Sequence, residues 1–274
     1  MLSVILASQF YKMSIEIQKL SKYYQEQLAL DEVSFKVNSG EIVGFLGPNG
    51  AGKSTTMKII SCFIKPSSGN VLVDGVSIHE NEIAVKTKIG YLPENNPLYE
   101  EMYVRESIAF IAQIHKVEDV KISVEEVIEK VGLTKEAHKK IGQLSKGYQQ
   151  RVGIAQAIVH DPEVLILDEP TSGLDPNQLE DIRALIKELG RNKTVMLSTH
   201  IMQEVESICD RIVVINNGKI VADRNLENAE TPTNKIEEQL VLVEFENKID
   251  TNHLKKHFPE TKIEKKDKKW LFQY

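Results

Sequence analysis

The stretch GPNGAGKS, residues 47–54, has the glycines and the lysine of a loop that binds phosphate groups. Glycines let the backbone curl so that successive N–H groups face the phosphates, Lys53 supplies a positive charge, and the Ser54 hydroxyl can coordinate Mg²⁺. An apolar run precedes the loop and a helical pattern follows it, which argues against a chance glycine turn. The predicted nucleotide contacts are Gly47, Pro48, Asn49, Gly50, Ala51, Gly52, Lys53, Ser54 and Thr55.

Two adjacent carboxylates, Asp168 and Glu169, follow the apolar run VLIL at residues 164–167. Ligands of open α/β sheets bind at the carboxyl ends of the strands, so we expect both acids beside the phosphate loop. Asp168 is predicted to hold Mg²⁺, directly or through water. Glu169 is predicted to orient and deprotonate an attacking water. The alternative is a pair of solvated turn residues, and the phosphate-loop motif argues against it.

A second anion-binding pattern occurs in LSKGYQQRVGIAQA, residues 144–157. It places Ser145 and Gly147 at the mouth of a helix, where unpaired backbone N–H groups and the helix dipole favour an anion. Lys146 adds a positive charge at the end of the helix where the dipole disfavours one. This pattern lies about a hundred residues after the phosphate loop, so it raises the question of which phosphate it contacts.

The elements that must position these residues alternate along the chain. Strands are predicted within residues 14–46, at 164–168, at 194–200 and at 211–221, with helices at 55–64, 177–191 and 201–210. This alternation predicts a mostly parallel sheet covered on both faces, the α/β fold of a phosphate-loop NTPase. Residues 97–142 carry helical periodicity without an obvious strand, which predicts an all-helical insertion.

The alternation breaks after about Ala229. A strand at 239–247, a helix at 251–258 and a strand at 269–274 predict a small α+β appendage over residues 235–274. The last 28 residues hold eight lysines against four acids, which favours a solvated surface over a contact with an anionic membrane or partner. The motif NKID at 247–250 matches the guanine-reading motif of GTPases, but it lies in this tail and DEPTSG stands where a GTPase has DxxG. We therefore interpret it as accidental.

Composition limits the classes of function. The net charge of −6 argues against nucleic acid as the main partner, and no apolar run approaches the length of a membrane span. Cys62 and Cys209 indicate core residues in a reducing compartment rather than a disulfide or a metal site. Residues 1–13 are predicted to be a disordered leader. Alternatively, Met13 is the true start and residues 1–12 precede it.

The second anion pattern resembles the signature of ABC transporter ATPases, because LSKGY followed by QQR lies about twenty residues before Asp168. The family's other motifs follow in its order over residues 14–228. Tyr24 matches the aromatic that stacks on adenine, and Glu94 in IGYLPE occupies the Q-loop position. SGLD at 172–175 matches the D-loop, with Asp175 as its acid, and His200 in STH matches the switch histidine.

The resemblance implies an ABC-type ATPase core over residues 14–230, with a helical subdomain at about 95–160. It implies ATP and Mg²⁺ as cofactors, with Ser54, Asp168 and Glu94 near the metal and Glu169, His200 and Glu94 as catalytic groups. Two copies would sandwich two ATPs, each held by the phosphate loop of one copy and by Ser145, Lys146, Gly147 and Tyr148 of the other. The second copy is either the same chain or a related one.

The resemblance also implies a location on the inner face of the cell membrane, beside a polytopic permease in a separate chain. Leu98, Tyr99, Met102 and Val104 in the helical insertion are expected to receive a short permease helix, or to be ordinary core residues.

Three positions depart from the family's pattern. Glu94 replaces the usual Gln, Lys146 the usual second Gly, and Tyr148 the usual Gln. The SKGY form and the PEN sequence at 93–95 resemble the ATPases of ABC-2-type exporters, most closely the gliding-motility-associated subunit. An exporter ATPase is therefore the predicted function. Its alternatives are a soluble ABC ATPase that acts on ribosomes and a weakly catalytic regulatory adaptor, and the transported substrate stays open.

Overall fold

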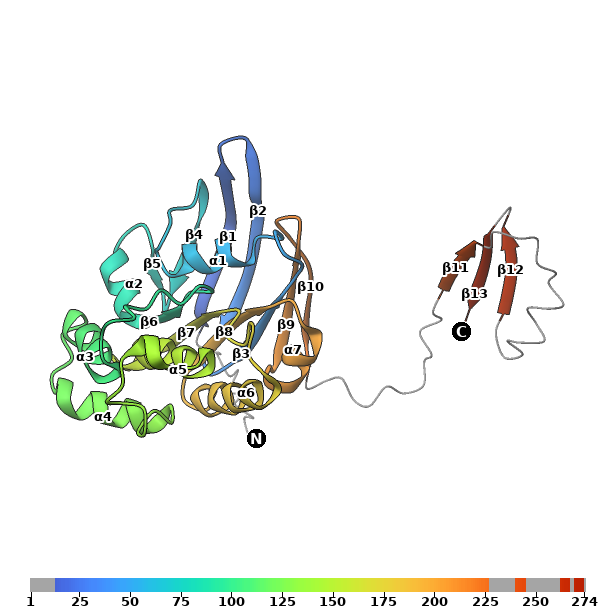
Figure 1. The fold of residues 1–274 in the computed structure, drawn as a ribbon. Coiled ribbons are helices and arrows are strands. Elements are labelled where there is room, and N and C mark those ends of the chain that lie inside the picture. The colour runs from blue at the N-terminus through green and yellow to red at the C-terminus, as the bar shows by residue number, and fades with distance from the viewer. Residues whose placement is uncertain (1–12, 227–239, 245–261, 267–268, 274) are drawn as a thin grey trace, which may run out of the picture. The chain divides into compact units, whose positions relative to one another are not determined.

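The structure, a computed structural model, describes residues 13–226, 240–244, 262–266 and 269–273. The chain forms two compact units, Met1–Glu227 and Asn228–Tyr274 (Figure 1). All the residues predicted to contact nucleotide, metal or attacking water lie in the first unit. The architecture of that unit therefore decides the geometry of the site.

The first unit contains a six-stranded sheet with the order β10-β9-β3-β8-β7-β6. Strands β9, β3, β8, β7 and β6 are parallel, and β10 pairs antiparallel with β9 at one edge. The central strands β7 and β8 are buried on both faces, which is why their middle residues, VLIL in β7 and VML in β8, are continuously apolar. The bounds are Ile42–Leu46 for β3, Ile89–Leu92 for β6, Val164–Asp168 for β7, Thr194–Thr199 for β8, Arg211–Asn216 for β9 and Lys219–Asn225 for β10.

A second sheet, with the order β2-β1-β4-β5, is antiparallel throughout. Its strands are β1 (Met13–Tyr24), β2 (Gln27–Asn38), β4 (Ser68–Val73) and β5 (Val76–Ser77). The six-stranded sheet is covered on both faces, but on this side its cover is the antiparallel sheet together with α1 rather than helices alone. The physical reason is visible in the alternating sequences SIEIQKL and VSFKV, because period-two alternation is typical of a sheet with one buried face.

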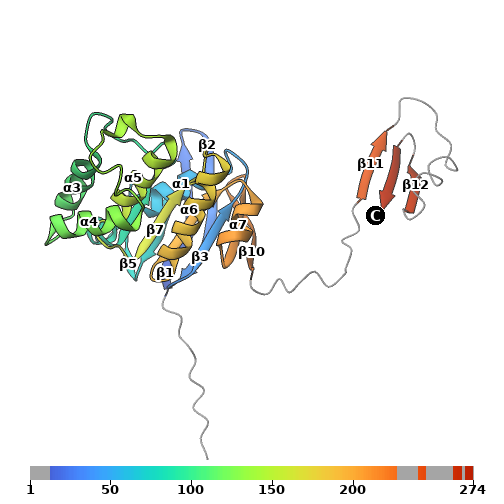
Figure 2. The ribbon, with the colours of Figure 1, turned by 60° about the horizontal axis from the view of Figure 1, so that its bottom comes forward.

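The two faces of the six-stranded sheet belong to two different hydrophobic cores. Val164 and Ile166 of β7 pack in one core with the antiparallel sheet and α1, whereas Leu165 and Leu167 pack in the other. Successive side chains of a strand point to opposite faces, so one apolar strand serves both cores. Figure 2 shows α5, α6 and α7 over the second face. Of the two thiols, Cys209 lies in this second core and Cys62 packs against the first.

The helices begin where the sequence supplies a cap or a turn. Asn81, Asp119, Ser145 and Asp175 accept hydrogen bonds from the first backbone N–H groups of α2, α4, α5 and α6. The helices are α1 (Lys53–Ile60), α2 (Glu82–Lys88), α3 (Val104–Ile114), α4 (Val120–Lys130), α5 (Lys146–Ile158), α6 (Pro176–Gly190) and α7 (Met202–Ile208), with a short 3₁₀ turn at Ile141–Gln143. Residues 97–142, expected to form an all-helical insertion, thus contain α3 and α4.

Helix α1 ends four residues earlier than its apolar pattern predicts. Cys62 has a positive φ of 56°, and the N–H groups of Phe63 and Ile64 both donate to the carbonyl of Lys58. A residue in the left-handed conformation turns the chain back over the helix end, so that N–H groups beyond the helix donate to its last carbonyls. The apolar residues after Ile60 therefore belong to a loop.

The described part of the second unit is a three-stranded antiparallel sheet with the order β11-β13-β12. Its strands are β11 (Leu240–Glu244), β12 (Lys262–Lys266) and β13 (Lys269–Gln273). Strand β12 was not expected from the sequence. The helix predicted at 251–258 and the NKID motif lie outside the described residues. None of the helices in the described ranges has the length and apolarity of a membrane span.

Two histidines stack where α3 meets β6. The rings of His115 and His160 are 3.7 Å apart and nearly parallel, and Nε2 of His160 lies 3.1 Å from the carbonyl oxygen of Ile89. A carbonyl can only accept, so Nε2 carries the proton. The buried Nδ1 has no hydrogen-bond partner within the described part of the chain. Burial, followed by the neighbouring His115, lowers the pKa of His160 to about 4, and burial also lowers the pKa of His115.

This stack predicts a pH-dependent loss of stability. The folded-state pKa of His160 lies below the value of about 6.5 in an unfolded chain, so its contribution is complete above pH 6.5 and is lost as the pH falls toward 4. The free energy of unfolding, followed by circular dichroism, should fall more steeply between pH 7 and 5 in the wild type than in His160→Gln. One proton limits the difference in slope to about 1.4 kcal/mol per pH unit.

His138→Gln is the matched control, because His138 is exposed. Its slope should equal that of the wild type. An equal slope in His160→Gln as well would contradict the role of this buried ring.

Candidate active site

The phosphate loop runs from the end of β3 into α1, and its glycines meet two separate constraints. Gly52 has a φ of +112°, a conformation that L side chains rarely adopt. A side chain at Gly47 would place its Cβ 2.3 Å from the carbonyl oxygen of Ile215. The loop therefore needs glycine at one position for its backbone conformation and at the other for its packing.

A cavity of about 460 Å³ opens over the loop. The predicted site residues that line it are Tyr24, Asn49, Gly50, Gly52, Lys53, Ser54, Thr55, Glu94 and Glu169. Residues that the sequence analysis did not single out complete the wall: Gln27, Leu28, Ala29, Asn217 and Gly218. Gly47, Pro48 and Ala51 do not line the cavity. Their part in the site is therefore to set the backbone shape of the phosphate loop.

The Lys53 ammonium is held at the base of this cavity. Its Nζ donates to the carbonyl oxygens of Gly47 at 2.9 Å and Pro48 at 3.4 Å, and lies 3.3 Å from Oε1 of Glu169. The lysine side chain is only 6% exposed. A buried charge needs hydrogen-bond and ionic partners, and these three oxygens fix the ammonium beside the loop.

Asp168 lies below the loop, at the end of β7, and is fully buried. Its Oδ1 accepts hydrogen bonds from the Ser54 hydroxyl of α1, at 3.1 Å, and from the Ser198 hydroxyl of β8. Its Oδ2 is buried and has no hydrogen-bond partner among the residues that the structure describes. An orphaned carboxylate oxygen beside a serine hydroxyl fits a hard cation, which takes oxygen ligands.

Glu169 and His200 are paired at the edge of the cavity. Nδ1 of His200 lies 3.0 Å from Oε2 of Glu169, and the other carboxylate oxygen faces Lys53. Glu169 has a positive φ of 49°, and its backbone N–H donates to Ser198. This left-handed turn sends Asp168 below the loop and Glu169 into the cavity, so adjacent acids reach different places.

A buried network supports this turn. Glu204 of α7 is 1% exposed and accepts hydrogen bonds from the hydroxyls of Thr171 and Thr199 through separate carboxylate oxygens. It thereby joins the segment after Glu169 to the segment before His200. Neither Glu204 nor Ser198 was predicted, although STH and DEPT place hydroxyls beside the predicted residues. The partner carboxylate comes from another helix, which no local pattern indicates.

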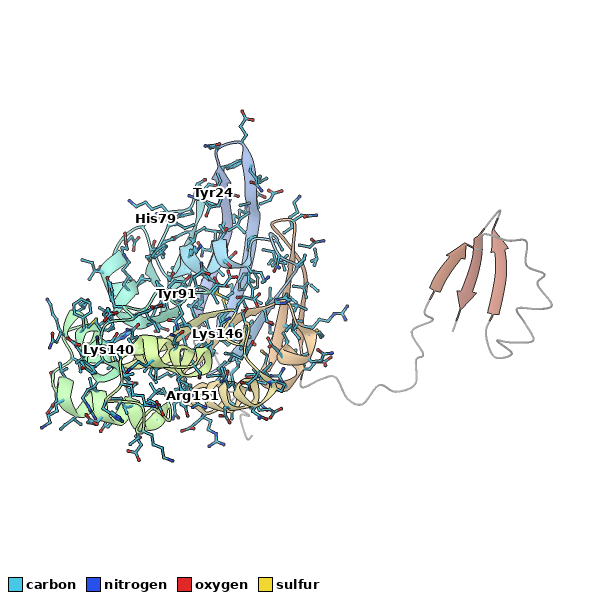
Figure 3. The ribbon with its side chains drawn as sticks, in the orientation of Figure 1. Tyr24, His79, Tyr91, Lys140, Lys146 and Arg151 are labelled. Atoms are coloured by element: carbon cyan, nitrogen blue, oxygen red, sulfur yellow. The ribbon has the colours of Figure 1, made fainter. Side chains whose placement is uncertain are left out.

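Tyr24 and Glu94 lie on different walls of the cavity. Tyr24, at the end of β1 (Figure 3), is half exposed, with Lys22 Nζ 5.3 Å from its ring centroid. Glu94 follows β6 and is exposed. Nearby, the hydroxyl of Tyr91 is buried, and none of the described residues forms a hydrogen bond with it. Burial raises the pKa of Tyr91, and the charges of Asp168 and Glu94 raise it further.

The predicted signature residues are not in this cavity. Ser145 caps α5 by accepting the N–H of Tyr148, and Gln178 of α6 contacts both Ser145 and Gly147. The Lys146 ammonium lies against Gly173, where an added Cβ would be 2.1 Å from Nζ. The mouth of α5 therefore contacts the loop before α6, and within one chain it does not line the wall around the phosphate loop.

Asp175 caps α6 within the same loop. Its Oδ1 accepts the N–H groups of Asn177 and Gln178, each at 3.0 Å. The predicted D-loop residue thus holds a helix end and aligns Gln178 with the mouth of α5. The structure brings Asp175 near the signature rather than near the phosphate loop of its own chain.

The residues expected to receive a permease helix differ in how far they are buried. Val104 is fully buried in the helical core, so the docking role is wrong for it, and its apolarity is explained by packing against α3's neighbours. Leu98 and Met102 are partly buried against the same core. Tyr99 is 68% exposed, so it is the one side chain of the four that is largely exposed to solvent.

The known proteins that this chain resembles belong to one family. The family model for the ABC transporter matches residues 30–172. The chain is 39% identical over 219 residues to an uncharacterized ABC transporter ATP-binding protein, YhcH, of Bacillus subtilis (strain 168), covering 79% of this chain and 72% of the relative. It is 36% identical over 215 residues to the Nod factor export ATP-binding protein I of Burkholderia pseudomallei (strain 1710b), covering 76% and 70%.

A solved structure shares the same cassette fold. The dimeric post-hydrolysis state of the ATP-binding cassette MJ0796, bound to ADP and Pi, matches with a TM-score of 0.72 at 28% identity, covering 77% of this chain and 98% of that one. The phosphate loop, the carboxylates after β7 and the signature at α5 therefore occur in a chain whose sequence and fold agree with one family. The chain belongs to the ABC transporter family, as an ATP-binding subunit that hydrolyses ATP to drive transport.

Proposed function

We propose that this chain powers an exporter, and that Lys53, Asp168, Glu169 and His200 carry its ATPase reaction. The observation that supports this most is their arrangement around the phosphate loop. Lys53 and Glu169 line the cavity over the loop, and His200 is paired with Glu169. Asp168 lies beneath the loop, where it accepts a hydrogen bond from Ser54 of α1. The exporter role is further supported by the printed function of the Nod factor export relative.

Binding of ATP follows from the loop and its lysine. The first N–H groups of α1 have no intrahelical partner and point toward the loop, where they favour phosphate oxygens. Lys53 is held close enough to the cavity to add a positive charge to the β- and γ-phosphates. Tyr24 offers an exposed aromatic face to the adenine ring, with Lys22 beside it.

Hydrolysis breaks the bond between the γ-phosphorus and the oxygen that bridges it to the β-phosphate. A water oxygen forms the new bond to phosphorus, its proton passes to Glu169, and ADP and phosphate leave. His200, 3.0 Å from Glu169, orients the carboxylate toward that water. Ser54 and Asp168, with its unpartnered Oδ2, are the residues that would hold Mg²⁺, and a bound Mg²⁺ neutralises charge on the phosphates. Glu94 lines the same cavity as Ser54, and its carboxylate can act as a further oxygen ligand of Mg²⁺.

Two copies complete the proposed machine. Ser145, Lys146, Gly147 and Tyr148 lie outside the cavity of their own chain, and they would contact ATP held by a second copy. The γ-phosphate would then bridge the interface, so that ATP favours the closed pair and hydrolysis releases it. Lys146 would face that phosphate, which offsets the unfavourable position of a cation at a helix N-terminus.

The permease is proposed to dock between α2 and α3. A cavity of about 530 Å³ lies there, and it is lined by Ile83 and Ile114, which are 77% and 59% exposed. Phe110 lies one turn before Ile114 on α3 and is also exposed. Exposed apolar side chains gathered at one cavity are typical of an interaction site. This placement puts the subunit on the inner face of the cell membrane.

The narrower assignment rests on short motifs alone. SKGY at 145–148 and PEN at 93–95 support a place among ABC-2-type exporters, and within them we propose the gliding-motility-associated subunit as the nearest type. A ribosome-associated ATPase and a weakly catalytic adaptor are the competing functions. The paired Glu169 and His200 favour an active ATPase over an adaptor.

Removing the carboxylate of Glu169 tests the catalytic roles. Glu169→Gln keeps the size of the side chain and loses the proton acceptor, so turnover should fall about 10²- to 10⁴-fold with ATP affinity changed only a few-fold. Steady-state hydrolysis and equilibrium binding of ATP measure the two quantities. Lys53→Ala should instead weaken ATP binding, because the positive charge beside the phosphates is lost. Wild-type turnover in Glu169→Gln would exclude the proton-acceptor role.

Isolation from membranes tests the transport role. The full chain, purified from detergent-solubilised membranes, should retain a polytopic partner, and Ile114→Asp should lose it because a charge enters the apolar cavity. Val221→Asp is the matched control, since Val221 is 58% exposed on β10, away from that cavity. Recovery of ribosomal proteins in place of a membrane protein would favour the ribosome-associated alternative.

A further inference from the structure

The turn between β9 and β10 forms part of the wall of the nucleotide cavity. Asn217 and Gly218, the two residues of this turn, both line the cavity. Their φ angles are 47° and 74°, the two positive values of a tight hairpin turn. None of the motifs discussed above includes this turn, and it lies more than 160 residues after the phosphate loop.

Two backbone hydrogen bonds place the turn between the loop and β2. The N–H of Gly218 donates to the carbonyl oxygen of Ala51 at 2.9 Å, and the N–H of Asp31 donates to the carbonyl oxygen of Gly218 at 2.9 Å. Ala51 is inside the phosphate loop and Asp31 is in the antiparallel sheet. The peptide groups of Gly218 therefore join the two walls of the cavity.

Close packing accompanies these bonds. A Cβ at Gly218 would lie 2.8 Å from the carbonyl oxygen of Ala29, and a Cβ at Gly52 would lie 2.6 Å from the side chain of Leu30 and 3.2 Å from that of Ile215. Backbone atoms cannot move aside as a flexible side-chain end can. The hairpin is therefore packed closely against both β2 and the phosphate loop, and it cannot move nearer to either of them.

The hydrogen bond at Ala51 determines where the next amide points. In a trans peptide the C=O of one residue and the N–H of the next point in opposite directions. The Ala51 carbonyl points to Gly218, so the Gly52 N–H points away from the hairpin. Gly52 itself lines the nucleotide cavity.

We propose that the Asn217–Gly218 turn is a positioning element of the nucleotide site. The amide of Gly218 fixes the Ala51–Gly52 peptide so that the Gly52 N–H faces the phosphates of the bound nucleotide. The inference rests on nucleotide binding at the phosphate loop. The turn acts through its backbone, and the side chain of Asn217 is secondary.

The test compares two glycines in similar turns. Asp74 and Gly75, between β4 and β5, have φ angles of 46° and 77°, close to those of Asn217 and Gly218, but a Cβ at Gly75 meets nothing within 4 Å. Gly218→Ala and Gly75→Ala therefore impose the same conformational strain. Only Gly218→Ala also forces the hairpin away from β2 and the loop.

ADP binding, measured by calorimetry, should be at least tenfold weaker in Gly218→Ala and within about twofold of wild type in Gly75→Ala. The KM for ATP should rise in the same ratio, with a smaller change in kcat, when both variants are assayed well below their melting temperatures. The melting temperature should fall further in Gly218→Ala, because only that variant adds a backbone clash. Equal ADP affinity in both variants would overturn the inference. Absence of ADP binding by the wild type would instead overturn the nucleotide site itself.

Asn217→Gly separates backbone from side chain, because glycine keeps the positive φ and the Gly218 hydrogen bond. Its loss of affinity for ADP should be clearly smaller than that of Gly218→Ala, because the backbone contact to Ala51 is kept. A loss as large as that in Gly218→Ala would place the role in the Asn217 side chain and contradict the proposal.

Hydrogen exchange on the wild-type chain tests the same point without a substitution, should Gly218→Ala fail to fold. Saturating ADP should slow exchange of the Gly218 amide along with the amides of residues 50–55, since one contact joins them. The amide of Gly75 is the internal control and should be unchanged. Protection of the loop with no change at Gly218 would refute the coupling.

Discussion

The site depends on one buried carboxylate. Asp168 has no exposed surface, yet it carries two hydrogen bonds on one oxygen and none on the other. Burying a charge is unfavourable unless neighbouring groups compensate it, and here the compensation comes from hydroxyls on α1 and β8. The three elements must therefore keep their spacing, which the parallel sheet ensures by aligning the carboxyl ends of β3, β7 and β8 at one edge.

The neighbouring residue reaches a different environment through backbone geometry alone. The positive φ of Glu169 turns its side chain up to Lys53 and His200 while Asp168 stays below the loop. A left-handed conformation at a residue other than glycine carries strain that the surrounding structure must offset. The hydrogen bond to Ser198 and the threonines held by Glu204 provide that support. Metal binding and proton transfer can thus be divided between two adjacent acids.

The cavity has walls from segments that lie far apart in the chain. The antiparallel sheet supplies Tyr24 and Ala29, the phosphate loop the floor, and the β9–β10 turn the third side. The signature at α5 supplies nothing to it, because α5 is oriented toward α6 and the loop before it. In the proposed function these are two half-sites of one chain, and their separation would favour assembly in pairs.

The sequence alone determined the features that depend on local backbone chemistry. The glycines and lysine of residues 47–54, the paired acids after an apolar strand, and the serine that caps α5 all lie where the pattern predicted, because turns and caps are set by a few adjacent residues. The parallel core was likewise predictable from buried apolar runs.

Only the tertiary structure decided which distant residues complete the site. Ser198, Glu204 and the Asn217–Gly218 turn contact residues between 5 and more than 160 positions away, and no spacing rule relates them. The division of the strands into two sheets, and the burial of Val104 in the helical core, also followed from packing. The physical reason is that apolar and hydroxyl side chains suit many environments, so their positions are set by what the folded chain brings beside them.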